Sequence, residues 1–359
     1  MTDNYDIALV VGTRPNFVKA APLLNKLEEQ NKKVLFIHTG QHFDENMSKN
    51  IFDDLSIRAP DKNLNAPSDS QSIQFQYIVE ELQKIFKNCN IGKVGVFGDV
   101  TSTLAASIAA KQSEIFLFHV ESGLRSNNLT MPEERNRIMV DAISDLLLIP
   151  SEDARENLLK ERVSSEKIHN VGNIMIDTLF KNKSKIIHNS ENIKDTLNIN
   201  KPYFVITLHR PSNLNDDTLK DIFEAISNFT QDYQVILPAH PRLKYYIVDN
   251  NIELTNIILI DPLSYIDFMS LVYGCDLVLT DSGGIQEETT YLGINCLTLR
   301  DETERPITVQ KGTNKVIGTD KENIINEINN VLGSKISKEA KIKYWDGETS
   351  DRIFKILFV

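Results

Sequence analysis

The segment IALVVGTRPN, residues 7–16, contains the unit from which the whole fold is built. Its apolar residues run without polar alternation, which predicts a strand that is covered on both faces. Gly12 and Thr13 then break the run, and an amphipathic stretch follows over residues 19–27. Pro22 falls in that stretch and is expected in the first turn of a helix, where its missing N–H is tolerated. A buried strand followed by a turn and a helix is the repeating unit of a parallel sheet.

The same alternation of apolar runs and amphipathic stretches continues along the chain. In the first half, strands are predicted at Ile7–Thr13, Lys33–Thr39, Val94–Asp99, Ile115–Glu121, Leu146–Pro150 and Ile168–Val171. In the second half, they are predicted at Tyr203–His209, Gln234–Ala239, Ile257–Ile260, Leu277–Thr280, Cys296–Leu299 and Lys315–Ile317. We therefore predict an α/β protein with two Rossmann-like, doubly wound domains, each built on its own parallel sheet.

A polar segment separates the two predicted domains. Residues 181–201, KNKSKIIHNSENIKDTLNINK, are rich in Asn and Lys and show no strong apolar face, so they are expected to form the linker. The N-terminal domain then covers residues 1–180 and is completed by residues 345–359. The C-terminal domain covers residues 202–344.

Composition and charge argue against several classes of protein. The 359 residues carry 39 Lys and Arg against 50 Asp and Glu, a formal net charge of −11, without the basic stripe that binds nucleic acids. The polar, acidic N-terminus and the short apolar run behind it predict a cytosolic protein with neither signal peptide nor membrane anchor. Cys89, Cys275 and Cys296 are widely spaced and form no CxxC pair, so we expect core thiols rather than disulfides or a zinc site.

Charged and small residues follow several predicted strands, at the sheet edge where doubly wound folds bind ligands. Arg14 comes directly after Gly12 and Thr13, so it is expected to reach a bound ligand; the alternative is a tight turn with a surface arginine. The sequence contains no GxGxxG, which argues against a binding turn for the pyrophosphate of a nicotinamide or flavin cofactor.

The segment TDSGGIQEE, residues 280–288, predicts a diphosphate site. Backbone N–H groups at Ser282, Gly283 and Gly284 are expected to be free at the start of a helix, whose dipole favours an anion. Glu288, one turn further on, is placed to reach the hydroxyls of a ribose. The alternative is an ordinary helix start capped by Asp281 or Ser282, although a cap does not require two glycines.

Three carboxylates stand near predicted strand ends in the first half. Asp99 closes one strand, Glu121 closes the next, and Glu133 follows in MPEERNR. Converging on an uncharged sugar ring, they would act as general base, general acid and stabiliser of a developing positive charge. Taken singly, Asp99 is instead a helix cap, and Glu133 with Glu134 is a solvated helix start.

Two histidines follow strands of the second half. His209 and Arg210 come after the first of these strands, and His240 comes after the second. A lone histidine is usually structural. A His-Arg pair at a strand end, facing the diphosphate turn, is a better candidate for the charge partner of a leaving diphosphate.

The motifs together resemble one enzyme family. The segments GTRPNFVKAAPL, HTGQHFDENMS, GDVTSTLAA, HVESGLRS, MPEERNR, TLHRP, TDSGGIQEE and RDETERP are similar, in order and spacing, to non-hydrolysing UDP-N-acetylglucosamine 2-epimerases, over about residues 7–320. The resemblance implies two Rossmann-like domains in a glycosyltransferase-B arrangement, with the active site in the cleft between them. It also implies a homodimer, and neither a metal nor a redox cofactor.

The resemblance also implies roles by position. The catalytic residues that it implies are Asp99, Glu121, Glu133 and His209. It implies Arg14 and Lys19 near the diphosphate and Ser282 and Glu288 as UDP contacts. The full set of predicted substrate- and UDP-binding residues is Arg14, Lys19, Arg137, Arg210, His240, Ser282, Gly283, Gly284, Glu288 and Arg305. The expected partner is the UDP-sugar substrate, with no nucleic acid and no membrane.

The implied reaction interconverts UDP-N-acetylglucosamine and UDP-N-acetylmannosamine, for surface polysaccharide precursors. The C2 hydrogen is not adjacent to a carbonyl and no oxidising cofactor is evident, so elimination is the remaining chemistry. UDP leaves C1, a carboxylate takes the C2 proton, and UDP adds back to the resulting 2-acetamidoglucal. Which carboxylate is the base stays open.

Two departures from the family pattern bear on the substrate. Residues 209–213 read HRPSN where relatives often read HRxEN, and residues 41–46 read QHFDEN where allosterically activated relatives read QHREML. The first departure bears on the contacts with the sugar, and from the second we expect no activation by a second UDP-sugar. GQHFDENMS and GLRSNNLTMPEE are closer to relatives that epimerise UDP-2,3-diacetamido-2,3-dideoxy-glucuronic acid, which is the second candidate substrate. The motifs are also compatible with a glycosyltransferase of the same architecture, a hydrolysing epimerase and an inactive nucleotide-sugar sensor.

Overall fold

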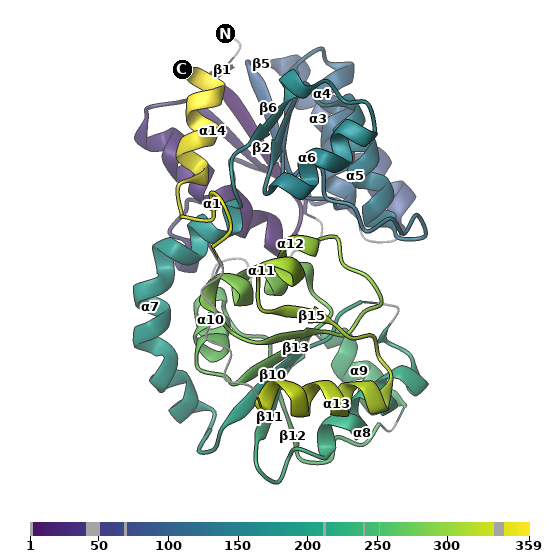
Figure 1. Ribbon diagram of the computed structural model, residues 1–359. Coiled ribbons are helices and arrows are strands. Elements are labelled where there is room, and N and C mark those ends of the chain that lie inside the picture. The colour runs from purple at the N-terminus through teal and green to yellow at the C-terminus, as the bar shows by residue number, and fades with distance from the viewer. Residues whose placement is uncertain are drawn as a thin grey trace. The chain divides into compact units, whose positions relative to one another are not determined.

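A parallel sheet forms the centre of each of the two units into which the chain divides (Figure 1). Unit 1 contains Met1–Lys181 and Lys343–Val359, and unit 2 contains Asn182–Ile342. The computed structural model describes residues 3–40, 51–67, 70–210, 213–239, 241–250, 252–333 and 341–359. The α/β class with two Rossmann-like sheets, which the sequence predicts, is confirmed.

The sheet of unit 1 has the strand order β4-β3-β2-β6-β7-β8-β9, and neighbouring strands are parallel. Its strands are β2 (Ile7–Val11), β3 (Val34–His38), β4 (Lys62–Asn63), β6 (Lys93–Phe97), β7 (Phe116–Val120), β8 (Leu146–Ile149) and β9 (Ile168–Asn170). A separate parallel pair is formed by β1 (Asp3–Tyr5) and β5 (Cys89–Ile91). The helices are α1 (Arg14–Glu29), α3 (Gln71–Asn88), α4 (Thr101–Gln112), α5 (Pro132–Ile143), α6 (Glu152–Lys160), the short 3-10 helix Ser165–Lys167, the first turns of α7 (Ile174–Thr196) and α14 (Thr349–Phe358).

The sheet of unit 2 has the strand order β12-β11-β10-β13-β14-β15 and is also parallel. Its strands are β10 (Tyr203–Thr207), β11 (Gln234–Pro238), β12 (Ile257–Ile260), β13 (Leu277–Thr280), β14 (Cys296–Thr298) and β15 (Asn314–Val316). The helices are the rest of α7 with α8 (Asp216–Ser227), α9 (Pro241–Asp249), α10 (Tyr265–Tyr273), α11 (Gly283–Leu292), α12 (Pro306–Gln310) and α13 (Lys321–Leu332).

The strands predicted from apolar runs are all present, with ends shifted by no more than two residues. The sequence did not predict β1, β4 and β5. These are two or three residues long and rich in Asp, Asn and Lys, so they carry neither the length nor the β-branched content of a central strand. Hydrophobic burial fixes the sheet centres, while the short outer pairings depend on tertiary contacts.

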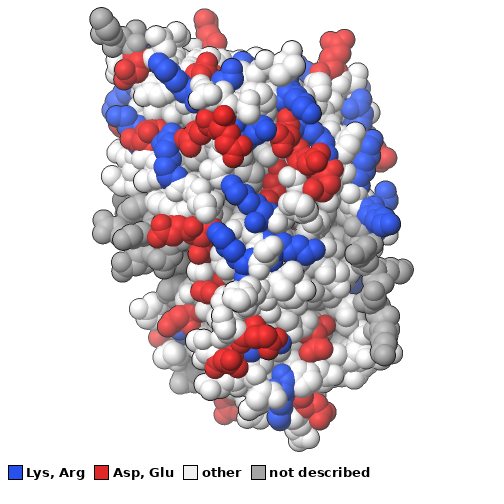
Figure 2. Space-filling view, turned by 90° about the vertical axis from the view of Figure 1, so that its left-hand side faces the viewer, with Lys and Arg blue, Asp and Glu red and all other residues white. Residues whose placement is uncertain are grey.

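The surface carries both signs of charge. On the face shown in Figure 2, Lys and Arg side chains lie among Asp and Glu side chains. Exposed ion pairs, such as the one between Lys84 and Glu81, contribute little stability because water screens them. In the described part of the chain, no helix combines the length and apolar character needed to cross a bilayer.

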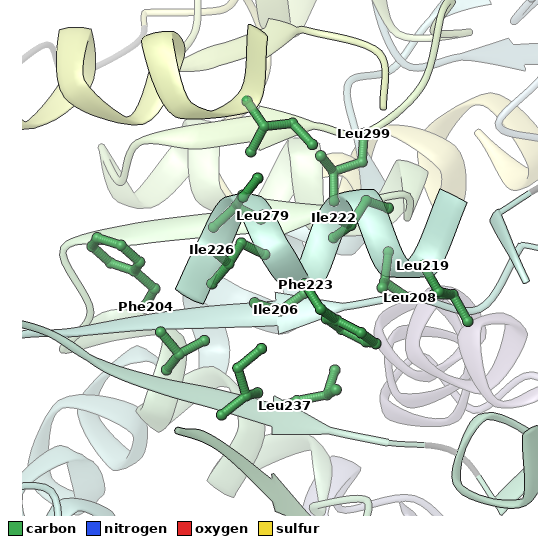
Figure 3. Close-up of a cluster of buried hydrophobic side chains, with 14 of the residues drawn as sticks. Phe204, Ile206, Leu208, Leu219, Ile222, Phe223, Ile226, Leu237, Leu279 and Leu299 are labelled. Atoms are coloured by element: carbon green, nitrogen blue, oxygen red, sulfur yellow. The ribbon is translucent and has the colours of Figure 1, made fainter. Parts of the chain in front are cut away.

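The core of unit 2 shows how an amphipathic helix covers its sheet. Leu219, Ile222, Phe223 and Ile226 recur on one face of α8 and are buried. Figure 3 shows these side chains pointing toward those of the neighbouring strands, including Ile206 of β10. Burying a side chain of this size stabilises the fold by about 1.5–3 kcal/mol, so this face alone decides where α8 packs.

The position of Pro22 differs from the prediction. The first turn of α1 holds Pro15, and Pro22 lies in the helix interior. A proline there leaves the carbonyl four residues earlier without its helical donor. The Thr178 hydroxyl, on α7, donates to that Val18 carbonyl at 2.7 Å. A side chain from a remote helix therefore makes the interior proline tolerable.

The segment expected to form the linker is mostly helical. Residues 181–196 continue α7, and the boundary between the units falls inside this helix. Ile186, Ser190 and Ile193 are buried at the spacing of one helix face. The middle residue of this buried face is a serine, and the neighbouring residues are mostly Lys and Asn. The sequence pattern therefore does not indicate an amphipathic helix here.

The three cysteines are unpaired. Cys296 is buried on β14, and burial raises the pKa of its thiol to about 12. Cys89 and Cys275 are only partly buried: Cys89 is the first residue of β5, and Cys275 lies in the loop between α10 and β13. The prediction of core thiols is therefore confirmed for Cys296 and is too strong for the other two.

The chain returns to unit 1 after completing unit 2. α14, yellow in Figure 1, packs against α1. Asp177 of α7 accepts hydrogen bonds from the backbone N–H groups of Thr349 and Ser350, at 3.0 and 2.7 Å. Trp345 Nε1 donates to the Pro150 carbonyl at 3.1 Å. These contacts attach the returning segment to the edge of the sheet and to two helices.

Replacing Thr178 with valine tests the account of Pro22. The variant keeps the side-chain shape but leaves the buried Val18 carbonyl without a donor, so we expect a loss of about 1–3 kcal/mol in the free energy of unfolding. Chemical denaturation followed by the fluorescence of Trp345, the single tryptophan, reports on unit 1. Thr130→Val, at an exposed position of the same unit, should change stability by no more than about 0.5 kcal/mol. Equal effects of the two variants would contradict the account.

Candidate functional site

Both sheets reverse their strand order at one point. In unit 1 the reversal lies between β2 and β6, and in unit 2 it lies between β10 and β13. Loops that leave such neighbouring strands run toward opposite faces of the sheet, which opens a ligand site at the carboxyl ends. Gly12 and Asp99 follow β2 and β6, and His209 and Asp281 follow β10 and β13. The predicted residues Asp99 and His209 therefore lie at the switch points of their units.

Asn16, which sequence reasoning did not select, ties the turn after β2 to the end of β6. Its Oδ1 accepts hydrogen bonds from the backbone N–H groups of Gly12 and Thr13, at 3.2 and 3.1 Å. Its Nδ2 donates to the Phe97 carbonyl at 3.0 Å. This side chain fixes the turn that presents Arg14, the half-buried first residue of α1.

Lys19 and Glu121 form a buried ion pair beside Gly98. A Cβ on Gly98 would stand 3.0 Å from Lys19 Nζ and 3.5 Å from Glu121 Oε2, and its φ of +65° favours glycine. Glu121 itself has φ +72°, a conformation that is rare for residues with a side chain and concentrates at functional sites. Lys19, predicted near the diphosphate, thus lies next to a predicted catalytic carboxylate.

Asp99 is held by α5. Its carboxylate accepts a hydrogen bond from Arg137 Nε at 3.0 Å, and its backbone carbonyl accepts one from Asn136 Nδ2 at 2.8 Å. The N-cap of α4 is Val100, so the interpretation of Asp99 as a helix cap is wrong. Arg137 is buried, and its Nη2 has no hydrogen-bond partner within the described residues. An unused buried N–H of this kind is typical of a ligand site.

The two glutamates at the start of α5 have different surroundings. Glu134 is buried and accepts hydrogen bonds from Ser126 N at 3.0 Å, from Asn127 N at 2.8 Å and from Arg137 Nη1 at 2.7 Å. Glu133 is half-buried in the first helical turn, where the dipole favours a negative charge. The alternative of a solvated pair is therefore wrong for Glu134, which fixes the preceding loop, and Glu133 stays the candidate for chemistry.

Asp281 is the centre of the group in unit 2. The carboxylate of this buried residue accepts hydrogen bonds from the backbone N–H groups of His209 and Arg210, at 3.0 and 2.9 Å, and contacts His209 Nδ1 at 2.6 Å. Burial acts to raise the pKa of Asp281, but the hydrogen bond and charge of His209 and the backbone donors outweigh it and lower the pKa. The His209 side chain is 55% exposed. The buried carboxylate thus orients a solvent-facing imidazole.

The start of α11 differs from the prediction in one detail. The N–H of Ser282 donates to Thr280 Oγ1 at 2.9 Å, so it is not free for an anion. The N–H groups of Gly283 and Gly284 lie in the first turn, where a helix supplies no acceptor. Ser282 is the N-cap residue, as the alternative of an ordinary helix start expects, but its side chain makes no cap hydrogen bond.

Gly283 packs against a buried group of charges. A Cβ there would stand 2.3 Å from Arg305 Nη1 and 2.6 Å from Glu304 Oε1. Glu304 contacts Arg305 at 2.5 Å, Arg300 at 2.8 Å and Arg210 at 3.4 Å. The sequence predicted Arg305 but not Glu304, although alternating acidic and basic residues in RDETERP are a signal for such a cluster. A larger residue at 283 would therefore displace the side chains of Glu304 and Arg305.

Two acidic residues of α11 are buried and paired. Glu288 accepts a hydrogen bond from Tyr265 Oη at 2.9 Å, and Glu287 contacts Arg305 Nε at 3.0 Å. Burial and the charge of Glu288 raise the pKa of Tyr265 well above its ordinary value. Tyr265 therefore stays a hydrogen-bond donor, and it fixes the carboxylate that the sequence proposes for ribose binding.

Some predicted residues lie outside the described part of the chain. They are His240 and the residues at positions 41–46 and 211–212, where the sequence differs from the family pattern. Over the ranges that the structure does describe, no group of three or more His, Cys, Asp or Glu side chains is arranged to hold a metal ion.

The chain is similar to proteins of one family along nearly its whole length. A family model described as UDP-N-acetylglucosamine 2-epimerase matches residues 25–358. A UDP-N-acetylglucosamine 2-epimerase from Methanococcus maripaludis is 37% identical, over 99% of this chain and 98% of the relative. The crystal structure of the Methanocaldococcus jannaschii UDP-GlcNAc 2-epimerase in complex with UDP-GlcNAc and UDP has a TM-score of 0.91 at 37% identity, covering 98% of this chain and 99% of that one. A UDP-2,3-diacetamido-2,3-dideoxy-D-glucuronate 2-epimerase from Pseudomonas aeruginosa is 34% identical, over 98% of this chain and 99% of the relative.

The buried charge of Asp281 predicts a pH-dependent contribution to stability. Asp281→Asn removes charge-assisted hydrogen bonds and should lower the free energy of unfolding by about 2 kcal/mol or more near neutral pH. Because the folded state lowers the pKa of Asp281, this contribution is present above the ordinary pKa of about 4 and disappears as the pH falls through the lower folded value.

Scanning calorimetry from about pH 7 to about pH 3 measures the difference between wild type and variant. The two melting temperatures should converge with acid. Asp276→Asn is the matched control, because Asp276 is exposed at the other end of β13 and accepts a backbone N–H from Tyr203 at 3.0 Å. A gap between wild type and Asp281→Asn that is constant with pH would refute the prediction.

Proposed function

We propose that this chain, which belongs to the UDP-N-acetylglucosamine 2-epimerase family, interconverts UDP-N-acetylglucosamine and UDP-N-acetylmannosamine. The observation that carries the proposal is the match, over nearly the full length of both chains, to an epimerase solved with UDP-GlcNAc and UDP. Asp99 at the switch point of unit 1, Glu121 after the neighbouring strand β7 and Glu133 at the start of α5 are proposed to supply the acid–base groups that the reaction needs. The family resemblance further supports a cytosolic homodimer that makes a precursor for surface polysaccharides.

The proposed chemistry is an elimination followed by an addition. The C1–O bond to UDP breaks and UDP leaves with the electron pair, while a carboxylate takes the C2 proton and a C1=C2 double bond forms. A proton then returns to the opposite face of C2, and a UDP oxygen adds to C1. No electrons are gained or lost overall, so the reaction requires no redox cofactor.

Unit 1 is proposed to carry out the proton transfers. Asp99 lies against Arg137, Glu121 against Lys19, and Glu133 is in the first turn of α5. Carboxylates in different surroundings can take different protonation states, which is what a base on one face and an acid on the other require. The charged partners also hold the carboxylates in fixed positions.

Unit 2 is proposed to hold UDP. His209 contacts Asp281 through Nδ1, which leaves Nε2 as the ring nitrogen for the diphosphate. Arg14 of unit 1 and Arg210 add positive charge, and the N–H groups of Gly283 and Gly284 suit phosphate oxygens. Glu288 is proposed to bind the ribose hydroxyls and Ser282 a phosphate oxygen. His240 and Arg305 are proposed as further contacts.

UDP-2,3-diacetamido-2,3-dideoxy-glucuronic acid is the second candidate substrate. The 34% identity to the Pseudomonas enzyme that is named for this sugar supports it. The GLRSNNLTMPEE segment, which resembles those relatives, contains the loop that Glu134 fixes at Ser126 and Asn127. The same elimination chemistry applies to both sugars, so only their C3 and C6 substituents distinguish the two candidates.

Incubation of the purified protein with either UDP-sugar alone tests the activity. In D₂O, the C2 epimer should accumulate with deuterium at C2, because the carboxylate exchanges its proton with solvent before returning it. Neither EDTA nor omission of NAD should reduce the rate. Proton NMR detects the products. Release of free N-acetylmannosamine would indicate a hydrolysing enzyme, and turnover only with an added acceptor would indicate a glycosyltransferase.

Asp99→Asn separates catalysis from structure. The amide keeps an oxygen acceptor for Arg137, so the melting temperature should stay close to that of wild type. A lost general acid or base should lower kcat by about 10²–10⁴-fold. Asp145→Asn is the control, because Asp145 holds Lys111 and the backbone N–H of Leu117 at the opposite end of β7. We expect this control to lower stability but leave kcat near wild type. Turnover of Asp99→Asn within a few-fold of wild type would remove Asp99 from the reaction.

A further inference from the structure

His119, in β7, is a buried histidine to which the proposed mechanism gives no role. Its side chain has no exposed surface. Nδ1 lies 2.7 Å from Asp141 Oδ1, and Nε2 lies 2.8 Å from the Gly98 carbonyl oxygen. Both ring nitrogens are therefore used, and each faces an oxygen.

The two partners determine which atoms donate. A carbonyl oxygen only accepts, so Nε2 carries a proton. The other Asp141 oxygen accepts from Gly123 N at 3.0 Å and from Arg125 at 2.8 Å, as expected for an ionised carboxylate. Burial acts to raise the pKa of Asp141, but the hydrogen bond and charge of His119, together with Arg125, lower it. An ionised Asp141 only accepts, so the geometry makes Nδ1 a donor as well, and both ring nitrogens face an acceptor.

The contact with Gly98 lies between two predicted catalytic residues. Asp99 comes directly after Gly98, and Glu121 comes two residues after His119. The Gly98 N–H donates to the Val120 carbonyl at 3.1 Å, so Gly98 is attached to β7 through both its N–H and its carbonyl. A shift of Gly98 would therefore move Asp99 relative to Glu121.

We propose that His119, by donating from both ring nitrogens, is a positioning residue that sets the spacing of Asp99 and Glu121. The proposal rests on the proposed epimerase function. The histidine touches no substrate in this account and acts only through the Gly98 carbonyl. Asp141, anchored by Arg125 and Gly123, fixes the ring from the other side.

Misplaced acid and base groups slow the proton transfers more than they weaken binding. A displacement of about 1 Å at reacting groups can cost about 10²-fold in rate. UDP is proposed to bind mainly to unit 2, whereas His119 belongs to unit 1. Loss of the Gly98 contact should therefore lower kcat and leave KM nearly unchanged.

Two amide variants separate the two contacts of the ring. His119→Gln places an amide nitrogen near the position of Nε2, so it keeps the donor to Gly98 and loses the one to Asp141. His119→Asn places its amide near Nδ1, so it keeps Asp141 and loses Gly98. We expect His119→Asn to be the more stable variant and to lose about 10–10²-fold in kcat. His119→Gln should be less stable yet keep kcat within about threefold of wild type.

The critical result is that the more stable variant, His119→Asn, is the less active one, and the less stable variant, His119→Gln, is the more active one. Ile78→Ala, in the core of the same unit, serves as a control that lowers the melting temperature without touching the carboxylates. If kcat follows melting temperature across all three variants, His119 is merely structural and the proposal is wrong. A rise in KM alone would overturn it as well.

A spectroscopic measurement tests the charge of the ring independently of activity. In protein labelled with ¹⁵N-histidine, without substrate, both ring nitrogens of His119 should show the signals of protonated nitrogen, and these signals should be missing from His119→Gln. A single unprotonated ring nitrogen would overturn the proposal. If wild type forms no C2 epimer, the proposed function fails instead, and this measurement still decides the state of His119.

Discussion

Each group of candidate functional residues is organised around one buried carboxylate. An ionised carboxylate in a protein interior must be surrounded by donors, because removing one partner of such a pair costs about 3–5 kcal/mol. Asp141 contacts a histidine, an arginine and a backbone N–H in unit 1, and Asp281 contacts a histidine and two backbone N–H groups in unit 2. These donors belong to strands or to the residues that follow them. Pairing the buried charge therefore also fixes the strand ends that present the other side chains.

The central strands could be predicted from sequence because their burial is visible in the residues. β13 is buried throughout and bounded by polar residues, and its predicted ends are correct. β1 and β4 contain Asp, Asn and Lys, and their pairing depends on partners that a local pattern does not reveal. The wrong prediction for Pro22 has the same cause. A proline in the helix interior is tolerated because the Thr178 hydroxyl donates to the Val18 carbonyl, and these two residues lie 160 positions apart in the sequence.

Candidate site residues could be predicted from sequence where they directly follow a strand, because the strand end fixes their position. They could not be predicted where an ion pair joins elements that are far apart in the sequence. Asp99 and His209 were selected because they follow strands. Their partners Arg137 and Asp281, 38 and 72 residues away, follow from the tertiary fold alone, although family resemblance pointed to the arginine. Glu134 and Glu304 look like surface charges in the sequence, because acidic residues are seldom buried unless they are paired.

The returning segment has a consequence for how the chain folds as it is made. Unit 2 ends at Ile342, whereas unit 1 lacks its α14 until residues 343–359 have been synthesised. Domains generally fold as units, N-terminal first, during synthesis. Here all residues of the second unit are synthesised before the first unit is complete, so unit 1 cannot finish folding until residues 343–359 have been added. Until then, α1 lacks the helix that packs against it, and the carboxylate of Asp177 lacks its backbone donors.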